Sequence, residues 1–124
     1  MNTIGIIIYP NGQMEKLKKS QLSNGKSAIN GIAKSEIEDY FGLPFEMVVP
    51  SYAIDKGMLT NSMRILEADV DIYTNPIATL LIGYRMITGT VVLVKINEYC
   101  EINTLNKDDI ESIYKLDKIV NGGI

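Results

Sequence analysis

The segment from Asn75 to Ile96 constrains the fold more than any other part of the chain. Asn75 is a residue type that caps helices, Pro76 suits the first helical position, and Gly83 suits the left-handed position that ends a helix. Thr88–Ile96 is almost continuously apolar, which is typical of a strand buried on both faces. We therefore predict a helix of about two turns followed by the central strand of a sheet.

A chain of 124 residues is long enough to form one domain with its own hydrophobic core. Further strands are predicted at Thr3–Tyr9 and Phe45–Val49, and a further helix begins at Asn106. We predict a single compact α+β domain over residues 1–124, with a mixed, mainly antiparallel sheet of four to six strands and two or three helices. Residues 97–124 are expected to be a C-terminal helical addition.

One further helix is predicted from apolar residues at spacings of three and four. It begins at Ser27 or at Ser35, and Gly42 is placed to end it as a left-handed cap. Pro44 follows and prevents its continuation.

The remaining segments have weaker patterns. Met63–Tyr73 nearly alternates apolar with charged residues, which predicts a strand with a bulge or two short strands. Ser51–Asn61 has little periodicity and is predicted to be a loop with a short strand near Met58. Gln13–Ser20 is basic and is predicted to be a solvated edge strand or a loop.

The chain contains no histidine and one cysteine, Cys100. The absence of histidine excludes a Ser-His or Cys-His nucleophile pair, an imidazole base and a His-ligated metal. Cys100 has no partner for an intramolecular disulfide, so a reducing, cytoplasmic setting is expected. Free cysteine is among the most buried residue types, and we predict that Cys100 is a small buried hydrophobe.

The charge and hydropathy of the chain argue against nucleic acid and membrane as partners. The net charge is −3, whereas general nucleic-acid binders need clustered Lys and Arg. The apolar run from Ile77 to Ile96 contains Arg85 and Lys95, which are costly within a membrane. The start of the chain lacks the basic region of a signal peptide. We expect a soluble protein without a membrane anchor.

Gly25-Lys26-Ser27 resembles the end of a phosphate-binding loop, but that motif needs a glycine where Ser20 stands. Nucleotide hydrolysis at this position is therefore not expected. An isolated anion site beside Lys26 at a helix start stays open. Glu36 and Asp39 lie one helical turn apart and could share a divalent cation, yet a solvated helix face is the more common arrangement. We predict no metal, no cofactor and no catalytic residue.

Asn75 also provides the best candidate for a ligand site. The free N–H groups of an exposed helix start bind anions, Thr79 lies one turn further on, and Arg85 could add a bidentate contact to a carboxylate or phosphate. The predicted ligand-binding residues are thus Asn75, Thr79, Arg85 and Lys26. The alternative is that Asn75 is a plain cap and Arg85 a surface or salt-bridging residue. Seven tyrosines beside two phenylalanines also favour a binding role mildly.

Three parts of the sequence resemble a small family of unknown function that phages, plasmids and integrated bacterial elements encode. They are the opening strand with its Pro-Asn-Gly turn, Glu36–Val48, and Asn75–Val94 with its Asn, Ala-Thr and Gly-led strand. Met58–Tyr73 and Asn97–Ile124 depart from the family pattern. The resemblance implies a mobile-element setting and carries over no catalytic residue.

These observations lead to two main hypotheses and a third alternative. The first is a non-enzymatic binding protein of a phage or mobile element that engages a host protein in the bacterial cytoplasm, with inhibition of host defence as the concrete version. The second is a sponge or sensor for a small anionic ligand such as a nucleotide. An enzyme that uses carboxylates, Lys, Tyr or Cys100 comes third. A homodimer is expected through an edge strand within Gln13–Leu22 or Met63–Tyr73.

Overall fold

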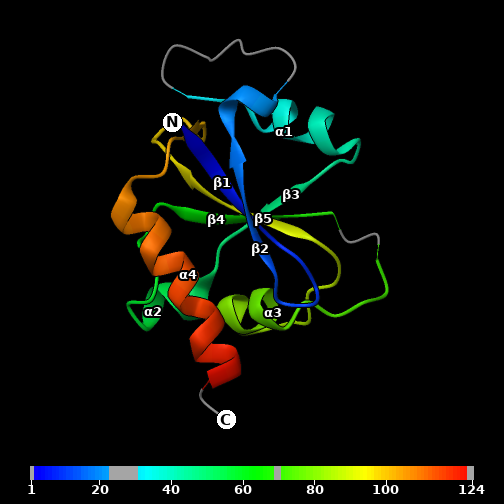
Figure 1. Cartoon of the computed structure of the whole chain (residues 1–124), viewed down its shortest axis with the longest axis vertical. Coiled ribbons are helices and arrows are strands. Elements are labelled where there is room, and N and C mark those ends of the chain that lie inside the picture. The colour runs from blue at the N-terminus through cyan, green and yellow to red at the C-terminus, as the bar shows by residue number, and fades with distance from the viewer. Residues whose placement is uncertain (1, 23–30, 69–70, 123–124) are drawn as a thin grey trace.

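The computed structural model describes residues 2–22, 31–68 and 71–122, and these form one sheet covered by helices (Figure 1). The strands are β1 (Thr3–Ile8), β2 (Met14–Lys18), β3 (Glu46–Val48), β4 (Met63–Glu67), β5 (Val91–Ile96) and β6 (Ile102–Asn103). The helices are α1 (Lys34–Phe41), α2 (Ser51–Asp55), α3 (Pro76–Ile82) and α4 (Lys107–Gly122), with a 3-10 turn, η1, at Lys19–Gln21.

The strand order is β2-β1-β5-β4-β3, and β6 pairs with the far end of β5. Each strand pair is antiparallel. This confirms the prediction of a single α+β domain with a mainly antiparallel sheet. The described residues hold four α-helices rather than two or three, because α2 was not predicted.

The strand β5 lies at the centre of the sheet, as predicted from its apolar run. Val91 and Leu93 point into one core cluster, and Val92 and Val94 point into the other. All four side chains are fully buried. A strand that is covered on both faces needs apolar residues at every position, which explains the absence of alternation in this part of the sequence.

The helices divide unequally between the two faces of the sheet. One face packs against α2, α3 and α4 through side chains such as Ala53, Leu81 and Ile113. The other face packs against α1 through Ile37, together with Phe45 of the following turn. Figure 1 shows α2, α3 and α4 on one side of the strands and α1 on the other.

Two helices end at the predicted glycines. Gly83 ends α3 at φ +86°, and Gly42 ends α1 at φ +70°, both in the left-handed region that glycine adopts without strain. α1 begins at Lys34, next to the later of the two predicted starts, Ser35. The earlier predicted start, Ser27, lies outside the described residues.

Two predicted segments differ from the structure. Ser51–Asn61 was expected to be a loop with a short strand, but Ser51–Asp55 forms the short helix α2 directly after Pro50. Met63–Tyr73 was expected to be a strand with a bulge or two short strands, but among its described residues only Met63–Glu67 forms a strand, β4. β4 also has β3 on one side and β5 on the other, so Met63–Glu67 is not an edge strand.

The C-terminal segment contributes to the main core. Asn106 and Asp109 cap α4 reciprocally: Asp109 N donates to Asn106 Oδ1 at 2.8 Å, and Asn106 N donates to Asp109 Oδ2 at 3.0 Å. Leu105, Ile113 and Leu116 lie in the same buried cluster as β1 and β5. Among the described residues, no helix is long and apolar enough to cross a membrane.

Candidate binding surface

Asn75 caps α3 as predicted, but it is buried rather than exposed. Its relative exposure is 0%, and its side chain uses its hydrogen-bonding groups inside the protein. Oδ1 accepts from Ala78 N at 3.1 Å, while Nδ2 donates to Ile8 O at 3.0 Å and to Gly89 O at 2.9 Å. The expectation of an exposed helix start is therefore wrong at Asn75, because the cap faces β1 instead of solvent.

The other predicted ligand-binding residues also have internal partners. Thr79 Oγ1 accepts from Ile87 N at 2.9 Å and so fixes the turn after α3. Arg85 Nη2 donates to Oε1 of the buried Glu67 at 2.5 Å. Lys26 lies outside the described residues. Asn75, Thr79 and Arg85 therefore each have partners inside the protein, and the role of the four residues in ligand binding stays a prediction.

The acidic residues of α1 have structural roles in the described part of the chain. Glu36 Oε2 accepts from Ala33 N in a capping contact. Glu38 Oε2 accepts from Phe45 N at 2.7 Å and from Lys34 Nζ at 2.9 Å. These two hydrogen bonds, the backbone one first, lower the pKa of Glu38. No group of three or more potential metal ligands occurs among the residues that the structure describes.

Cys100 is exposed, so the prediction of a buried cysteine is wrong. It lies in the turn between β5 and β6 at φ +60°, a left-handed conformation that is uncommon for a residue other than glycine. The side chain of Asn97 holds this turn, because its Oδ1 accepts from Tyr99 N and from Glu101 N. Turn chemistry, rather than the apolar character of the thiol, sets the position of Cys100.

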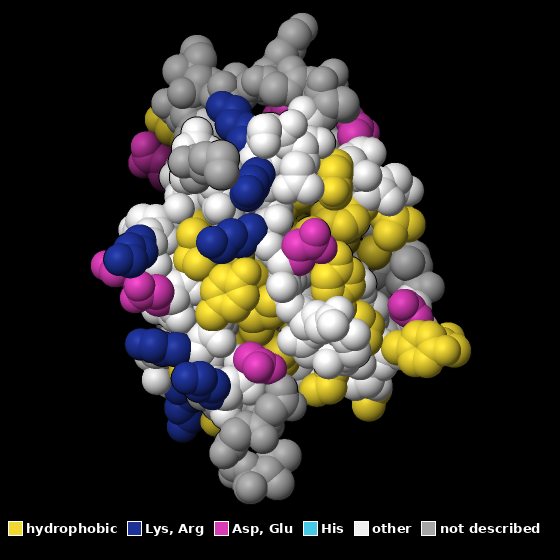
Figure 2. Space-filling view, in the orientation of Figure 1, with side chains coloured by type: hydrophobic (Ala, Val, Ile, Leu, Met, Phe, Trp, Pro, Cys, Tyr) yellow, Lys and Arg dark blue, Asp and Glu magenta, His cyan; other side chains and the backbone are white. Residues whose placement is uncertain are grey.

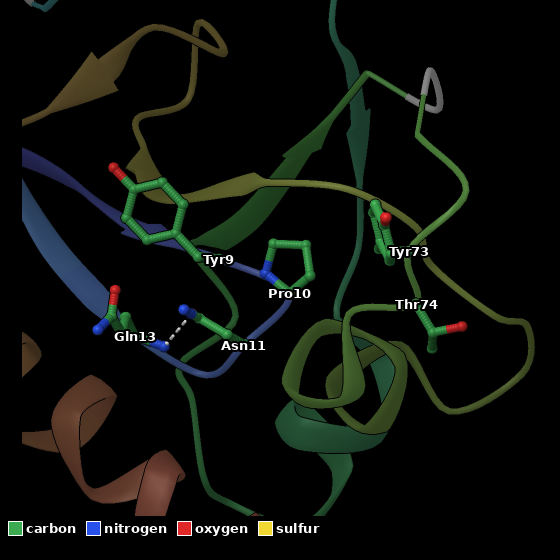
Figure 3. A pocket seen from close by; sticks show the side chains of 6 residues that line it. All are labelled: Tyr9, Pro10, Asn11, Gln13, Tyr73 and Thr74. Atoms are coloured by element: carbon green, nitrogen blue, oxygen red, sulfur yellow. Dashed lines mark hydrogen bonds between the residues drawn. The ribbon is translucent and has the colours of Figure 1, made fainter.

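A hollow lies between the β1–β2 turn and the segment that precedes α3. It has a volume of about 520 Å³, and we call it the aromatic groove; its lining residues are Tyr9, Pro10, Asn11, Gln13, Tyr73 and Thr74. Figure 3 shows the rings of Tyr9 and Tyr73 on opposite sides of Pro10. None of these six residues carries a formal charge at neutral pH.

One wall of the aromatic groove comes from the turn that Pro10-Asn11-Gly12 predicts. Gly12 adopts φ +89°, its N–H donates to Tyr9 O, and Gln13 N donates to Asn11 Oδ1 (Figure 3). The hydroxyl of Tyr9 donates to Glu15 Oε1 at 2.6 Å. This hydrogen bond, together with partial burial and the negative charge of Glu15, raises the pKa of Tyr9 to about 12.

The other wall comes from Asp71–Thr74, which an isolated antiparallel bridge between Thr74 and Thr88 holds in place. Asp71 Oδ1 accepts from Ile72 N and from Tyr73 N in a tight turn. Ile72 and Tyr73 have relative exposures of 86% and 66%. Exposed apolar side chains therefore lie at the rim of the groove.

Asn75 connects the two walls of the aromatic groove. It follows Thr74 directly, and its Nδ2 donates to the carbonyl of Ile8, the residue before Tyr9. The wall segments are therefore fixed relative to each other by a buried hydrogen bond between residues 67 positions apart in the chain. Asn75, which the sequence indicates as a ligand contact, thus holds the two walls of the groove together.

The sequence alone did not predict the aromatic groove, although it indicated two of its features. The surplus of tyrosine and the Pro-Asn-Gly turn were both evident, but Tyr73 was expected to lie in a strand. No local signal brings Tyr73 next to Tyr9, because their proximity depends on the pairing of β1 with β5 and on the position of α3.

Comparisons with models of protein families, with curated proteins and with solved structures found no match to the chain.

Proposed function

We propose that the protein is a non-enzymatic binding protein that engages another protein through the aromatic groove. The observation that carries the proposal is an uncharged, aromatic groove with strongly exposed apolar residues at its rim. In the concrete version of the proposal, the protein belongs to a phage or mobile element and inhibits a host defence protein. That setting draws on the sequence resemblance alone.

The side chains at the groove are those that protein interfaces favour. Tyr and Met are enriched in interface cores, where an aromatic ring buries a large area at a small cost in side-chain entropy. Met86 is 65% exposed, and its sulfur accepts from Thr74 Oγ1 at 3.4 Å, so it adds to the apolar rim. An exposed apolar cluster next to a hollow is costly in water unless a partner covers it.

The groove supports a protein partner better than a small anionic ligand. Binding a nucleotide requires Lys, Arg or converging N–H groups near the phosphates, and the lining of the aromatic groove includes no Lys or Arg. Its two tyrosine rings and Pro10 instead provide flat apolar surfaces for the side chains of a partner.

Site-specific photo-cross-linking in bacterial lysate tests this proposal. A benzoylphenylalanine in place of Tyr73 is expected to form a discrete adduct with one protein, while the same substitution at Tyr99 is expected to form none. The two tyrosines are matched because their exposures are 66% and 65%, and Tyr99 lies in the turn between β5 and β6.

The identified partner is then purified and titrated against the protein. Tyr73→Ser is expected to weaken binding by at least about tenfold, which corresponds to 1.4 kcal/mol. Tyr99→Ser is expected to leave binding unchanged. Equal adducts from both positions, or equal affinities for both variants, would contradict the proposal that the groove is the binding surface.

A further inference from the structure

The second surface of interest is the outer edge of β2, which is a terminal strand of the sheet. The other end of the sheet, β3, is only three residues long, and Pro44 and Pro50 lie close to its two ends. Short strands and prolines protect an edge from further pairing. β2 has five residues and no proline, so it is the more open of the two edges.

The register of β2 shows which of its backbone groups face outward. Tyr9 N donates to Gln13 O, and the same pairing continues through Ile7 with Glu15. Hydrogen-bonded and non-hydrogen-bonded pairs alternate along an antiparallel ladder. The N–H and C=O groups of Met14 and Lys16 therefore point away from β1, where an added strand would meet them.

α4 runs beside this edge and forms a trough with it. One hollow of about 420 Å³ lies between the residues from Asn11 to Met14 and the side chains of Tyr114 and Asp117. A second hollow of about 320 Å³ lies between Lys16 and the α4 residues Ile110, Glu111, Tyr114, Lys115 and Lys118. Tyr114 lines both hollows, so they are neighbours along β2, and we call the two together the β2–α4 trough.

The second hollow of the trough is positively charged. Lys16, Lys115 and Lys118 line it, against the single carboxylate of Glu111. Lys18, the last residue of β2, and Lys19, directly after it, continue the run of positive charge. Figure 2 shows Lys and Arg side chains gathered over β2 and α4, whereas hydrophobic side chains dominate the other half of this face. This local charge contrasts with the net charge of −3 for the whole chain.

Lysines on an edge strand commonly prevent edge-to-edge association, and this explains why a second copy of the chain is a poor occupant. Antiparallel pairing of β2 with another β2 would bring Lys16 and Lys18 close to the same lysines of the other copy. An acidic strand has the opposite preference, because its carboxylates would meet the three lysines that line the trough.

We propose that the β2–α4 trough docks an extended acidic segment of a partner protein, which pairs with β2 as an additional strand. This inference rests on the proposed function only in requiring a protein partner, and it adds the place and chemistry of one contact. Backbone hydrogen bonds to Met14 and Lys16 hold the segment, and alternate side chains lie toward α4. Carboxylates at these positions contact Lys16, Lys115 and Lys118.

A synthetic peptide tests the charge of the proposed occupant. The probe is a fluorescein-labelled ten-residue peptide that alternates Glu or Asp with Val or Thr, and its binding is followed by fluorescence anisotropy at low salt. The peptide is expected to bind, and Lys16→Glu combined with Lys118→Glu is expected to weaken binding by at least about tenfold. Lys56→Glu is the matched control, because Lys56 lies over the ring of Tyr52 and outside the trough.

The Lys16→Gln and Lys118→Gln pair serves the same purpose if the charge-reversed pair does not fold. Binding that is absent at about 1 mM peptide, or that falls equally in the Lys56→Glu control, would overturn the proposal. Equal binding of a peptide with Lys in place of every Glu and Asp would overturn it as well.

The strand-addition step has its own test. A peptide of the same sequence, N-methylated at alternate residues, keeps its charge but loses the backbone donors on one edge. One of the two possible N-methylation patterns is expected to lose at least about tenfold in affinity, because only one edge of the peptide faces β2. If both N-methylated peptides bound fully, charge attraction alone would account for binding, and strand addition would be overturned.

Two other occupants of the trough, a nucleic acid and a second copy of the chain, can be told apart from an acidic segment by experiment. Tighter binding of a ten-nucleotide single-stranded DNA than of the acidic peptide would assign the trough to nucleic acid. A concentration-dependent dimer in sedimentation that Lys16→Pro abolishes would assign the edge to a second copy, because proline removes the outward N–H of residue 16. Each result would overturn the proposal for the trough but would not bear on binding at the aromatic groove, which the Tyr73→Ser variant tests.

Discussion

Two neighbouring parts of the chain have environments opposite to those that their residue types favour. They are the pair Ile72 and Tyr73, and Asn75. Ile72 and Tyr73 are the two most exposed of the large hydrophobic side chains described, whereas Asn75 is polar and fully buried. The buried amide makes three hydrogen bonds, and the exposed side chains contribute little to the core. A buried polar group and an exposed apolar cluster are the informative departures from the usual distribution.

The comparison separates the residue that supports the groove walls from the residues that we propose contact a partner. Asn75 keeps the groove walls in place through its contact with Ile8, and Ile72 and Tyr73 are free to contact a partner. Substitutions in these two places should therefore have opposite effects on stability and on binding. Five variants, taken from the largest expected effect to the smallest, test that division.

Asn75→Asp should destabilise the protein most, by roughly 3–5 kcal/mol. The carboxylate can still accept from Ala78 N, but it replaces the Nδ2 donor with a negative oxygen that faces the carbonyls of Ile8 and Gly89. Urea denaturation followed by circular dichroism measures the change. Asn11→Asp, at an exposed turn position, is the control and should cost less than about 1 kcal/mol. Similar losses for the two variants would contradict a supporting role for Asn75.

Gly89→Ala should cost about 2 kcal/mol and should disturb the wall that contains Tyr73. Gly89 adopts φ +79°, and an added Cβ would lie 2.9 Å from Cβ of Asp71. Gly57→Ala is the matched control, because φ is +71° there and no atom lies within 4 Å of the added Cβ. The difference between the two losses, measured in urea, isolates the contact with Asp71. No difference would show that this contact does not hold the wall.

Tyr9→Phe should cost about 1 kcal/mol at neutral pH, because it removes the hydrogen bond to Glu15. The pKa of Tyr9 is raised to about 12, so the folded protein holds this proton more tightly than the unfolded chain does. The contribution is therefore fully present below pH 10 and is lost as the pH rises from 10 to 12. The stability difference between Tyr9→Phe and the original protein, measured by urea denaturation, should disappear over that interval.

Ile72→Ser and Tyr73→Ser should change the free energy of unfolding by less than about 0.5 kcal/mol each. Both side chains are largely exposed, so little packing is lost. Thermal denaturation measures stability, and titration of the cross-linked partner measures binding. A large loss of stability would show that the rim of the groove belongs to the core and would remove the contrast with Asn75.

The sequence predicts those parts of the fold that local chemistry determines. Asn75, Pro76 and Gly83 define both ends of α3, and Gly42 defines the end of α1, because caps depend on a few neighbouring residues. The central position of β5 follows from its apolar run, since only burial on both faces favours such a composition.

The parts that depend on tertiary position were not predictable in this way. Whether a capping asparagine is buried depends on which element packs against the helix start. For Asn75 that element is β1. α2 is too short to show a helical period, so Ser51–Asp55 gave no usable pattern. The aromatic groove joins residues from two distant segments, and the trough joins β2 with α4, so neither has a local sequence signal.

Cys100 provides a single site for thiol-specific labelling of the molecule. It is the only cysteine in the chain, it is exposed, and it lies beyond the end of β5 that is remote from Tyr9, since Val91 at the start of β5 pairs with Ile8. A maleimide attached there would join each molecule to a surface or a dye in one orientation, with the aromatic groove directed away. Immobilised in this way, the unmutated protein would present its groove freely to a partner in solution.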